Sequence, residues 1–402
     1  MKLLKIILVL TAFISLSACN TESSEVQETT AYLQPAVTES ENTQQIQETI
    51  YTRYPELSQY DIFSPYYERA EEIVNNMTAQ QKAGQMFWIS CPDNETDAND
   101  FVSRYNPGGY VLSAENFENS KPYSMKSMLE NFQSASPFRM AVACEEEGGD
   151  FVCASKYTQF RLNPFYSPQT LYQIGGFDEI FSDTRSKAEF LKELGINTNL
   201  APVADVSENP TDYIYDRTLG KNADDTGQYV KLSVRAYNEA GISCVLKHFP
   251  GYGSNINTSH TISVDEREYS EFTSKDFIPF TEGIKANAPC IMVSHNTIVS
   301  MDVANPASLS APVHDILRTS LGFTGIIMTD DLADSAEYDK IGEVDVFLNA
   351  INAGNDILYT SEYKEGLPAV VKAVQTGKLS EQRINTSVIR IIAWKLAYGI
   401  IS

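Results

Sequence analysis

Eight short apolar runs recur between residues 84 and 360, and they constrain the fold more than any other feature of the sequence. Most are rich in β-branched or aromatic residues and lack clean polar alternation, which is typical of strands buried on both faces of a parallel sheet. The runs are GQMFWIS (84–90), GGYVLS (108–113), FRMAVACEE (138–146), INTNLAPVADV (196–206), GISCVLKHF (241–249), CIMVSH (290–295), GIIMTDD (325–331) and NDILYT (355–360).

Helix-like segments separate many of these runs. Four of them carry apolar residues at helical spacing: 182–196, 224–242, 305–326 and 342–357. The first two contain Gly195 and Gly241, which are natural helix stops. Eight strands alternating with helices predict an α/β fold, a single (β/α)8 barrel of the TIM type over residues 66–402. A doubly wound open sheet is the alternative, but no GxGxxG pattern follows any run.

The residues before the barrel are predicted to form a targeting segment and a linker. Two lysines and an apolar run precede Leu-Ser-Ala-Cys19, which resembles a bacterial lipobox. Residues 1–19 are therefore predicted to be a lipoprotein signal peptide, with export and lipid anchoring through Cys19 to the outer face of a cell membrane. A plain signal peptide with a chance cysteine is the alternative. Residues 20–65 are rich in Glu, Gln, Ser and Thr, which predicts a flexible acidic tether.

Charge and cysteine content exclude several classes of function. The formal net charge is −23, and no cluster of Lys and Arg is present, so a nucleic-acid partner is not expected. The cysteines after Cys19 are odd in number and form no CxxC pattern, which predicts neither a disulfide framework nor a metal site. No pattern in the sequence indicates a cofactor.

Polar side chains follow several of the predicted strands. In a barrel of this type the active site forms at the carboxyl ends of the strands. The residues found there are Glu145, Asp205, Lys247, His248, His295 and Asp330. Carboxylates, a lysine and histidines without a metal-ligand pattern suit sugar chemistry, because a glycosidase needs an ionised carboxylate and a proton donor. Trp88, Phe249 and Tyr252 are candidates for packing against a sugar ring.

Several ordered blocks carry a family resemblance. They are MTAQQKAGQMF, EEEGG, LGINTNLAPVADV, DRTLG, KHFPGYG, IMVSH, NPASLS, LGFTGIIMTDDL and AINAGNDIL. With these blocks the chain resembles, over roughly residues 70–400, the barrel of glycoside hydrolase family 3 in its single-domain bacterial β-N-acetylglucosaminidase (β-N-acetylhexosaminidase) branch. The resemblance implies a retaining exo-glycosidase whose partner is a carbohydrate, with terminal β-N-acetylglucosaminides of cell-wall fragments or other glycans as substrates.

The resemblance also implies roles for individual residues. Asp330 of MTDDL matches the nucleophile, and Asp331 is expected to be a capping or solvated carboxylate. His260, on the loop after the fifth strand, matches the acid/base. The implied substrate-binding residues are Glu145, Asp205, Arg217, Lys247 and His248. The implied supporting residues are Asn257, Thr258 and His295.

Four positions depart from the family pattern. Glu145 stands where the family has an aspartate that binds sugar hydroxyls, and it is one methylene longer. Thr258 stands where the family pairs its loop histidine with an aspartate, and neither Thr258 nor Asn257 carries a charge to stabilise an imidazolium. Tyr252 replaces a histidine, and Asp150 replaces an arginine. These departures leave open a sugar-binding surface lipoprotein with reduced or lost catalysis, or a family enzyme with β-glucosidase or phosphorylase specificity. A metal-dependent barrel hydrolase is the weakest alternative, because the first predicted strand has no histidine.

Overall fold

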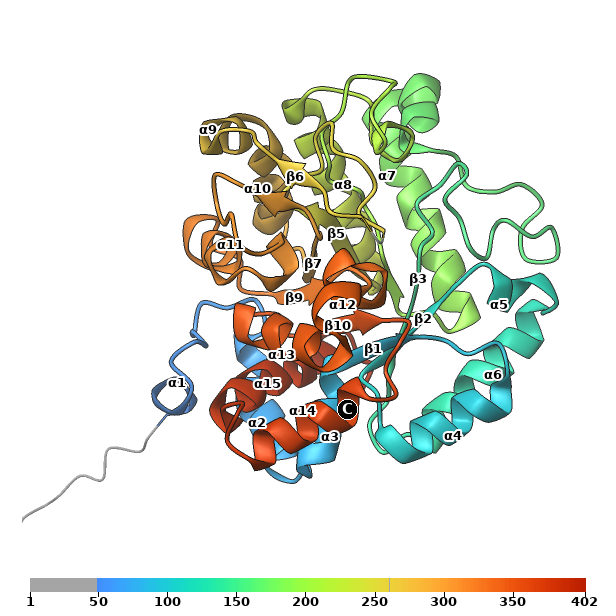
Figure 1. Cartoon of the computed structure of the whole chain (residues 1–402). Coiled ribbons are helices and arrows are strands. Elements are labelled where there is room, and N and C mark those ends of the chain that lie inside the picture. Colours follow the sequence, from blue (N-terminus) through green and yellow to red (C-terminus); the bar gives the residue numbers. More distant parts are fainter. Residues whose placement is uncertain (1–48, 260) are drawn as a thin grey trace, which may run out of the picture. The chain divides into compact units, whose positions relative to one another are not determined.

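The computed structural model describes residues 49–259 and 261–402, which contain a parallel eight-stranded sheet curled into a nearly closed barrel (Figure 1). Each predicted apolar run contains one strand, so the predicted barrel is confirmed. The strands are β1 (Phe87–Ser90), β2 (Gly109–Leu112), β3 (Ala141–Cys144), β4 (Thr198–Asn199), β5 (Ser243–Phe249), β7 (Cys290–Val293), β9 (Ile326–Thr329) and β10 (Leu358–Thr360). A separate two-stranded sheet pairs β6 (Val264–Asp265) with β8 (Thr297–Ile298).

The order of the strands fixes which loops face each other across the mouth of the barrel. The order is β10-β1-β2-β3-β4-β5-β7-β9. The two ends approach each other through a parallel bridge between Met328 and Ile357, and the Asp356 amide donates to the Ile327 carbonyl at 2.8 Å. In this ring β3 and β9 are four places apart in either direction, so the loops that follow them lie on opposite sides of the mouth.

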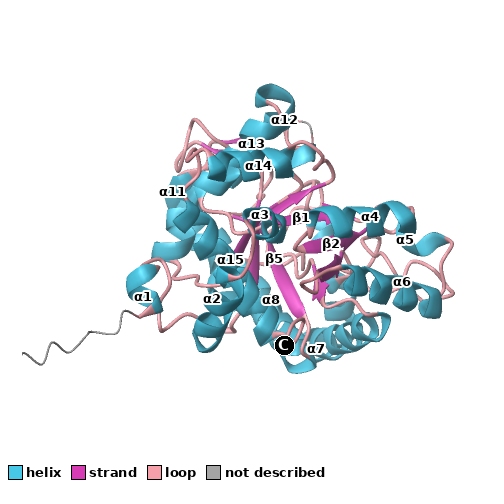
Figure 2. Ribbon diagram, turned by 90° about the horizontal axis from the view of Figure 1, so that it is seen from below, coloured by secondary structure: helices cyan, strands magenta, loops and turns pink. Residues whose placement is uncertain are grey.

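Helices surround the strands, as the view from below shows (Figure 2). The longer ones are α2 (Tyr67–Asn75), α3 (Ala79–Met86), α4 (Glu95–Tyr105), α6 (Pro122–Ala135), α7 (Pro168–Leu194), α8 (Ala223–Ala240), α10 (Phe277–Lys285), α13 (Glu343–Ala353), α14 (Gly366–Gln375) and α15 (Glu381–Ala397). Gly195 and Gly241 end α7 and α8 in the left-handed conformation, with φ of 89° and 69°. The predicted helix over 305–326 is shorter and irregular: α11 (Ala311–Asp315) continues into a π-helical turn over Ile316–Ser320.

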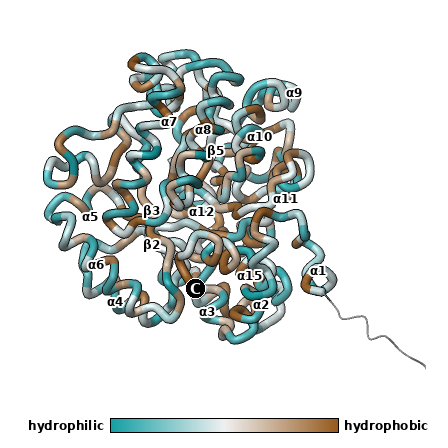
Figure 3. Tube along the Cα trace, turned by 180° about the vertical axis from the view of Figure 1, so that it is seen from behind, coloured by the Kyte–Doolittle hydropathy of each residue, from teal (hydrophilic) through white to brown (hydrophobic). Residues whose placement is uncertain are grey.

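The core lies inside the barrel and between the strands and the helices. In Figure 3 hydrophobic segments gather along the strands, while the outer loops are mostly hydrophilic. Trp88 is fully buried against Trp394 of α15, with ring centroids 5.6 Å apart. Phe249 is fully buried against Phe277 and Phe280 of α10. The prediction that Trp88 and Phe249 pack against a sugar is therefore wrong, because both rings contact the helix layer instead of the mouth.

The folded domain begins earlier than the predicted boundary at residue 66. Helix α1 (Ile50–Arg53) and the chain after it bury Ile50, Leu57 and Phe63 in the main core. Widely spaced apolar residues anchor this segment although its average composition is polar, which is why composition alone places the end of the tether too late. Residues 1–48, which include Cys19 and most of the predicted tether, lie outside the described residues. Within the described part of the chain, no helix is long and apolar enough to cross a membrane.

A buried ion cluster joins the chain before β10 to the outer helices. Asp356 is fully buried and lies 2.7 Å from guanidinium nitrogens of both Arg318 and Arg390. Its carboxylate also accepts hydrogen bonds from the Ser387 hydroxyl at 2.6 Å and the Ile327 amide at 3.1 Å. Burial alone would raise the pKa of Asp356, but the surrounding guanidinium groups lower it to about 2.

Candidate active site

Asp330 directly follows β9 and lines a cavity at the mouth of the barrel. The cavity has a volume of about 190 Å³, and seven residues predicted from the sequence line it: Glu145, Arg217, His248, Asn257, Thr258, His295 and Asp330. Tyr252, which was predicted to pack against a sugar, also lines it. Seven of the residues to which the sequence assigned roles therefore lie around one cavity. His260, the predicted acid/base, lies outside the described residues.

The two adjacent aspartates have different environments. Asp330 accepts one hydrogen bond, from the Asp331 amide at 2.9 Å. Burial raises its pKa, but interactions with the two histidines, the hydrogen bond from the Asp331 amide and the Lys247 charge together outweigh burial and hold the pKa below the usual value, so Asp330 is ionised at neutral pH. Asp331 instead caps the turn Leu332–Asp334 and accepts from the amides of Ala333 and Ser361 at 3.0 and 2.9 Å. Burial raises the pKa of Asp331 to about 6.

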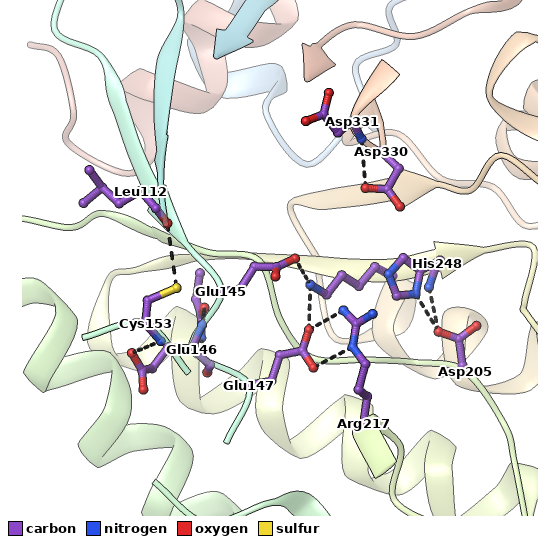
Figure 4. A network of polar contacts seen from close by, with 12 residues as sticks. Leu112, Glu145, Glu146, Glu147, Cys153, Asp205, Arg217, His248, Asp330 and Asp331 are labelled. Carbon is purple, nitrogen blue, oxygen red and sulfur yellow. Dashed lines mark hydrogen bonds and ion pairs between the residues drawn. The ribbon is translucent and has the colours of Figure 1, made fainter. Parts of the chain in front are cut away.

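A chain of ion pairs lies across the mouth from Asp330 (Figure 4). The fully buried Lys247 ammonium lies 2.7 Å from a carboxylate oxygen of Glu145 and 2.7 Å from one of Glu147. Arg217 donates two hydrogen bonds to Glu147, at 3.0 and 2.6 Å. Burial opposes ionisation of Glu147, yet Arg217 and Lys247 lower its pKa to about 2. Glu147 received no role from the sequence, where its only signal is its place as the third glutamate of EEEGG.

His248 is held by a carboxylate behind it. Its Nδ1 lies 2.8 Å from Asp205 Oδ2, and its backbone amide donates to the same oxygen at 3.1 Å. The Tyr252 amide donates to the other Asp205 oxygen at 2.7 Å. Asp205 is almost fully buried, so the structure places it as the residue that orients His248, whereas the sequence assigned it to substrate binding.

His295 supports the main chain that carries the aspartates. Its Nε2 lies 3.0 Å from the Asp331 carbonyl oxygen, and its Nδ1 lies 2.8 Å from the Ser308 hydroxyl. A carbonyl oxygen can only accept, so Nε2 carries the proton and Nδ1 accepts from Ser308. Burial lowers the pKa of His295, consistent with a neutral ring at pH 7.

Two of the four departures from the family pattern contact each other. The Tyr252 phenol lies 2.7 Å from the Thr258 hydroxyl, and both residues are 3 % exposed. The Tyr252 ring also meets the His248 ring edge-on, with centroids 5.1 Å apart. Nearby, Asn257 accepts from the Ser259 amide at 3.1 Å. Through Tyr252, Thr258 therefore connects the loop after β5 to His248 near the end of that strand, although Thr258 carries no charge.

Replacing one partner of this link is expected to cost more than replacing both. Tyr252→Phe or Thr258→Val leaves one buried hydroxyl unpaired, which should lower the free energy of unfolding by about 1–3 kcal/mol. The double variant removes both hydroxyls and should lie closer to the wild type than the sum of the single changes. Denaturant titration of the four proteins measures this coupling. Strictly additive losses would show that the hydrogen bond contributes nothing.

The described residues show no metal-binding arrangement. In 49–259 and 261–402, no three His, Cys, Asp or Glu side chains converge as metal ligands would. The polar groups of the cavity are instead engaged with each other or with the backbone. The site therefore presents an ionised carboxylate at Asp330, a second carboxylate, Glu145, that is part of an ion network, and two histidines held by hydrogen bonds.

Comparison with known proteins agrees with the family resemblance of the sequence. The model of the glycosyl hydrolase family 3 N-terminal domain matches residues 78–394. A β-hexosaminidase A of Pseudoalteromonas piscicida is 28 % identical over 329 residues, which cover 74 % of this chain and 55 % of that protein, so the chain spans about half of that relative. The β-hexosaminidase LpqI of Mycobacterium tuberculosis is 27 % identical over 330 residues, covering 79 % of this chain and 83 % of the relative.

A solved structure shows the same architecture. The family 3 β-N-acetylglucosaminidase from a Paenibacillus strain superposes with a TM-score of 0.75 at 25 % identity. The superposition covers 81 % of this chain and 63 % of that one. The likeness extends to most of the described barrel.

Proposed function

Because the chain belongs to glycoside hydrolase family 3, we propose that it hydrolyses terminal β-N-acetylglucosaminides of cell-wall fragments or other glycans with retention of configuration. One observation carries the proposal: an ionised, sparsely bonded Asp330 faces, across a small cavity, a wall of polar groups that can bind sugar hydroxyls. The named relatives are β-hexosaminidases, which supports the choice of substrate.

The proposed reaction has two steps. The Asp330 carboxylate attacks the anomeric carbon, the bond from that carbon to the aglycone oxygen breaks, and the oxygen takes a proton from an acid. Water then attacks the glycosyl ester, gives a proton to the same group, and releases the sugar and free Asp330. The ordinary pKa of histidine is near neutrality, so a histidine can serve as acid and then as base. His260 is proposed for this role.

Substrate contacts are proposed for the opposite wall. Glu145, whose side chain is 45 % exposed, and His248 can accept or donate to hydroxyls of the terminal sugar. Arg217 also lines the cavity, although its main partner is Glu147. Lys247 is buried behind Glu145, so its proposed role is to fix that carboxylate as well as to meet the sugar.

A product analysis tests the proposal and separates it from its alternatives. Incubation with an aryl N-acetyl-β-glucosaminide should release the aryl alcohol and N-acetylglucosamine at a rate independent of phosphate, and the corresponding aryl β-glucoside should be a poorer substrate. A phosphate-dependent rate with a sugar 1-phosphate as product would indicate a phosphorylase instead. Saturable binding without turnover would indicate a sugar-binding protein. The uncharged Thr258 favours this alternative, because it cannot stabilise an imidazolium.

Export and membrane anchoring through Cys19 are also proposed, on the sequence LSAC alone. Fractionation of producing cells tests this. The wild-type protein should sediment with membranes, and the Cys19→Ser variant should not.

A further inference from the structure

Two cysteines flank the segment that carries Glu145 and Glu147. Cys144 is the last residue of β3, and Cys153 follows the segment. The Cys153 thiol donates to the Leu112 carbonyl at 3.7 Å, and Leu112 is the register partner of Cys144 across β2 and β3 (Figure 4). Both cysteines therefore adjoin the same residue of the neighbouring strand.

The side chain of Cys144 faces the segment that contains Cys153. Successive side chains of an extended chain alternate between two sides, so Cys144 and Glu146 leave it on the side opposite to Glu145, which lines the mouth. On that side the Glu146 carboxylate accepts from the amides of Cys153 and Ala154 at 3.3 and 2.9 Å. The neighbouring Cys153 thiol, together with burial, raises the pKa of Cys144, as expected for two adjacent thiols.

Of the two cysteines, Cys153 is the one that a reagent meets first. Both are free thiols in the structure. Cys153 is 7 % exposed and lines a cavity of about 290 Å³, which shares Glu145 and Phe151 with the cavity at Asp330. Cys144 is fully buried. An incoming group therefore reaches Cys153 from the mouth of the barrel, and Cys144 lies behind it.

We propose that Cys144 and Cys153 form a redox site, which low-molecular-weight disulfides oxidise to an intrachain disulfide. The Cys153 thiolate attacks one sulfur of the reagent, the S–S bond of the reagent breaks, and one reagent thiol leaves. The Cys144 thiolate then attacks Cys153 Sγ, the mixed disulfide breaks, and the second reagent thiol leaves. Two protein thiols are oxidised, one reagent disulfide is reduced, and the two protons pass to the released thiols.

The new bond closes a ring around residues 145–152, which include Glu145 and Glu147. The two sulfur atoms must move together to form the bond, which shifts both ends of this segment. Glu145 directly follows Cys144, and its carboxylate lies 2.7 Å from the Lys247 ammonium. Oxidation should therefore weaken the sugar contact of Glu145 and raise the KM for an aryl N-acetyl-β-glucosaminide by about threefold or more, an effect that rests on the proposed function.

Oxidised glutathione tests the redox site on the full chain, with mass measurement and peptide mapping as readouts. The wild type should become lighter by two hydrogen atoms and yield a peptide that joins Cys144 to Cys153, and dithiothreitol should reverse both changes. Cys144→Ser lacks the second thiol, so the glutathione adduct on Cys153 should persist. Cys153→Ser should form no such link, and its KM should not respond to glutathione. Cys244 and Cys290, which are fully buried and line neither cavity, should remain thiols.

The possible failures are distinguishable. A glutathione adduct that persists on Cys153 of the wild type, or free thiols at both positions, would overturn the redox site. If the reduced protein hydrolyses the aryl glycoside and complete oxidation leaves KM unchanged, the effect on Glu145 is overturned. If the reduced protein hydrolyses no glycoside, the proposed function fails, and the mass and the peptide map still decide on the redox site.

Discussion

Replacing Asp330 by asparagine is expected to reduce the hydrolysis of an aryl N-acetyl-β-glucosaminide by about 10⁴-fold, because the amide cannot form the glycosyl ester. The change is nearly isosteric, and an asparagine Oδ1 can still accept the Asp331 amide that Asp330 accepts now at 2.9 Å. The fold should therefore be retained, which circular dichroism and thermal unfolding can verify. Turnover is measured by release of the aryl alcohol.

Asp331→Asn is the matched control for this experiment. Its Oδ1 can still accept the amides of Ala333 and Ser361, so the rate should fall by no more than about tenfold. A mechanism-based fluorosugar should label a peptide that contains Asp330 in the wild type and in Asp331→Asn, but not in Asp330→Asn. Equal losses in the two variants, or a label on Asp331, would contradict the assignment of the nucleophile.

The largest effect on stability is expected at Asp356. Asp356→Asn removes the negative charge between Arg318 and Arg390 and leaves buried guanidinium groups without compensation, which should lower the free energy of unfolding by about 3–5 kcal/mol. Asp315→Asn, an exposed change on the neighbouring helix, should alter it by less than about 0.5 kcal/mol. Chemical denaturation measures both. A loss at Asp356 no larger than that at Asp315 would show that the cluster is already well hydrated.

The contribution of Asp356 has a defined pH dependence. Its pKa of about 2 lies below the value of about 3.9 for an unfolded aspartate, so the unfolded chain binds its proton first as the pH falls. The stabilisation is therefore complete above the unfolded pKa and is lost as the pH falls through the folded pKa. The difference in unfolding free energy between wild type and Asp356→Asn should stay constant from pH 5 to 8 and shrink below about pH 4.

The barrel could be predicted because its signal is local and repeated. Each strand is a continuous apolar run, and the side chains after the runs meet at one mouth for geometric reasons alone. The orientation of single aromatic rings was not predictable in this way. Trp88 and Phe249 lie on strands whose successive side chains point to opposite faces, and only the three-dimensional packing on Trp394 and Phe280 shows which face each ring takes.

The candidate site was predictable in part. Residues that end strands were placed correctly at the mouth, but their partners are distant in the sequence or have no distinctive pattern. Glu147 joins Lys247 and Arg217, which are 100 and 70 positions away, and no periodicity links these residues. The contact between Tyr252 and Thr258 was likewise not predictable, because both residues lie in an irregular loop where no periodicity links the two positions.

The two carboxylates around Lys247 differ in exposure, and the proposed binding of a sugar at Glu145 depends on that difference. Glu147 is 4 % exposed and neutralises the Lys247 ammonium whether or not a ligand is present. The Glu145 side chain is partly exposed, so its carboxylate can exchange the ammonium for a ligand. A sugar hydroxyl can therefore compete for Glu145 without stranding a cation in a low-dielectric interior. Because the Lys247 ammonium already holds Glu145 in place, binding of a hydroxyl there needs little reorganisation, and selectivity depends on how well that hydroxyl fits the exposed Glu145 carboxylate.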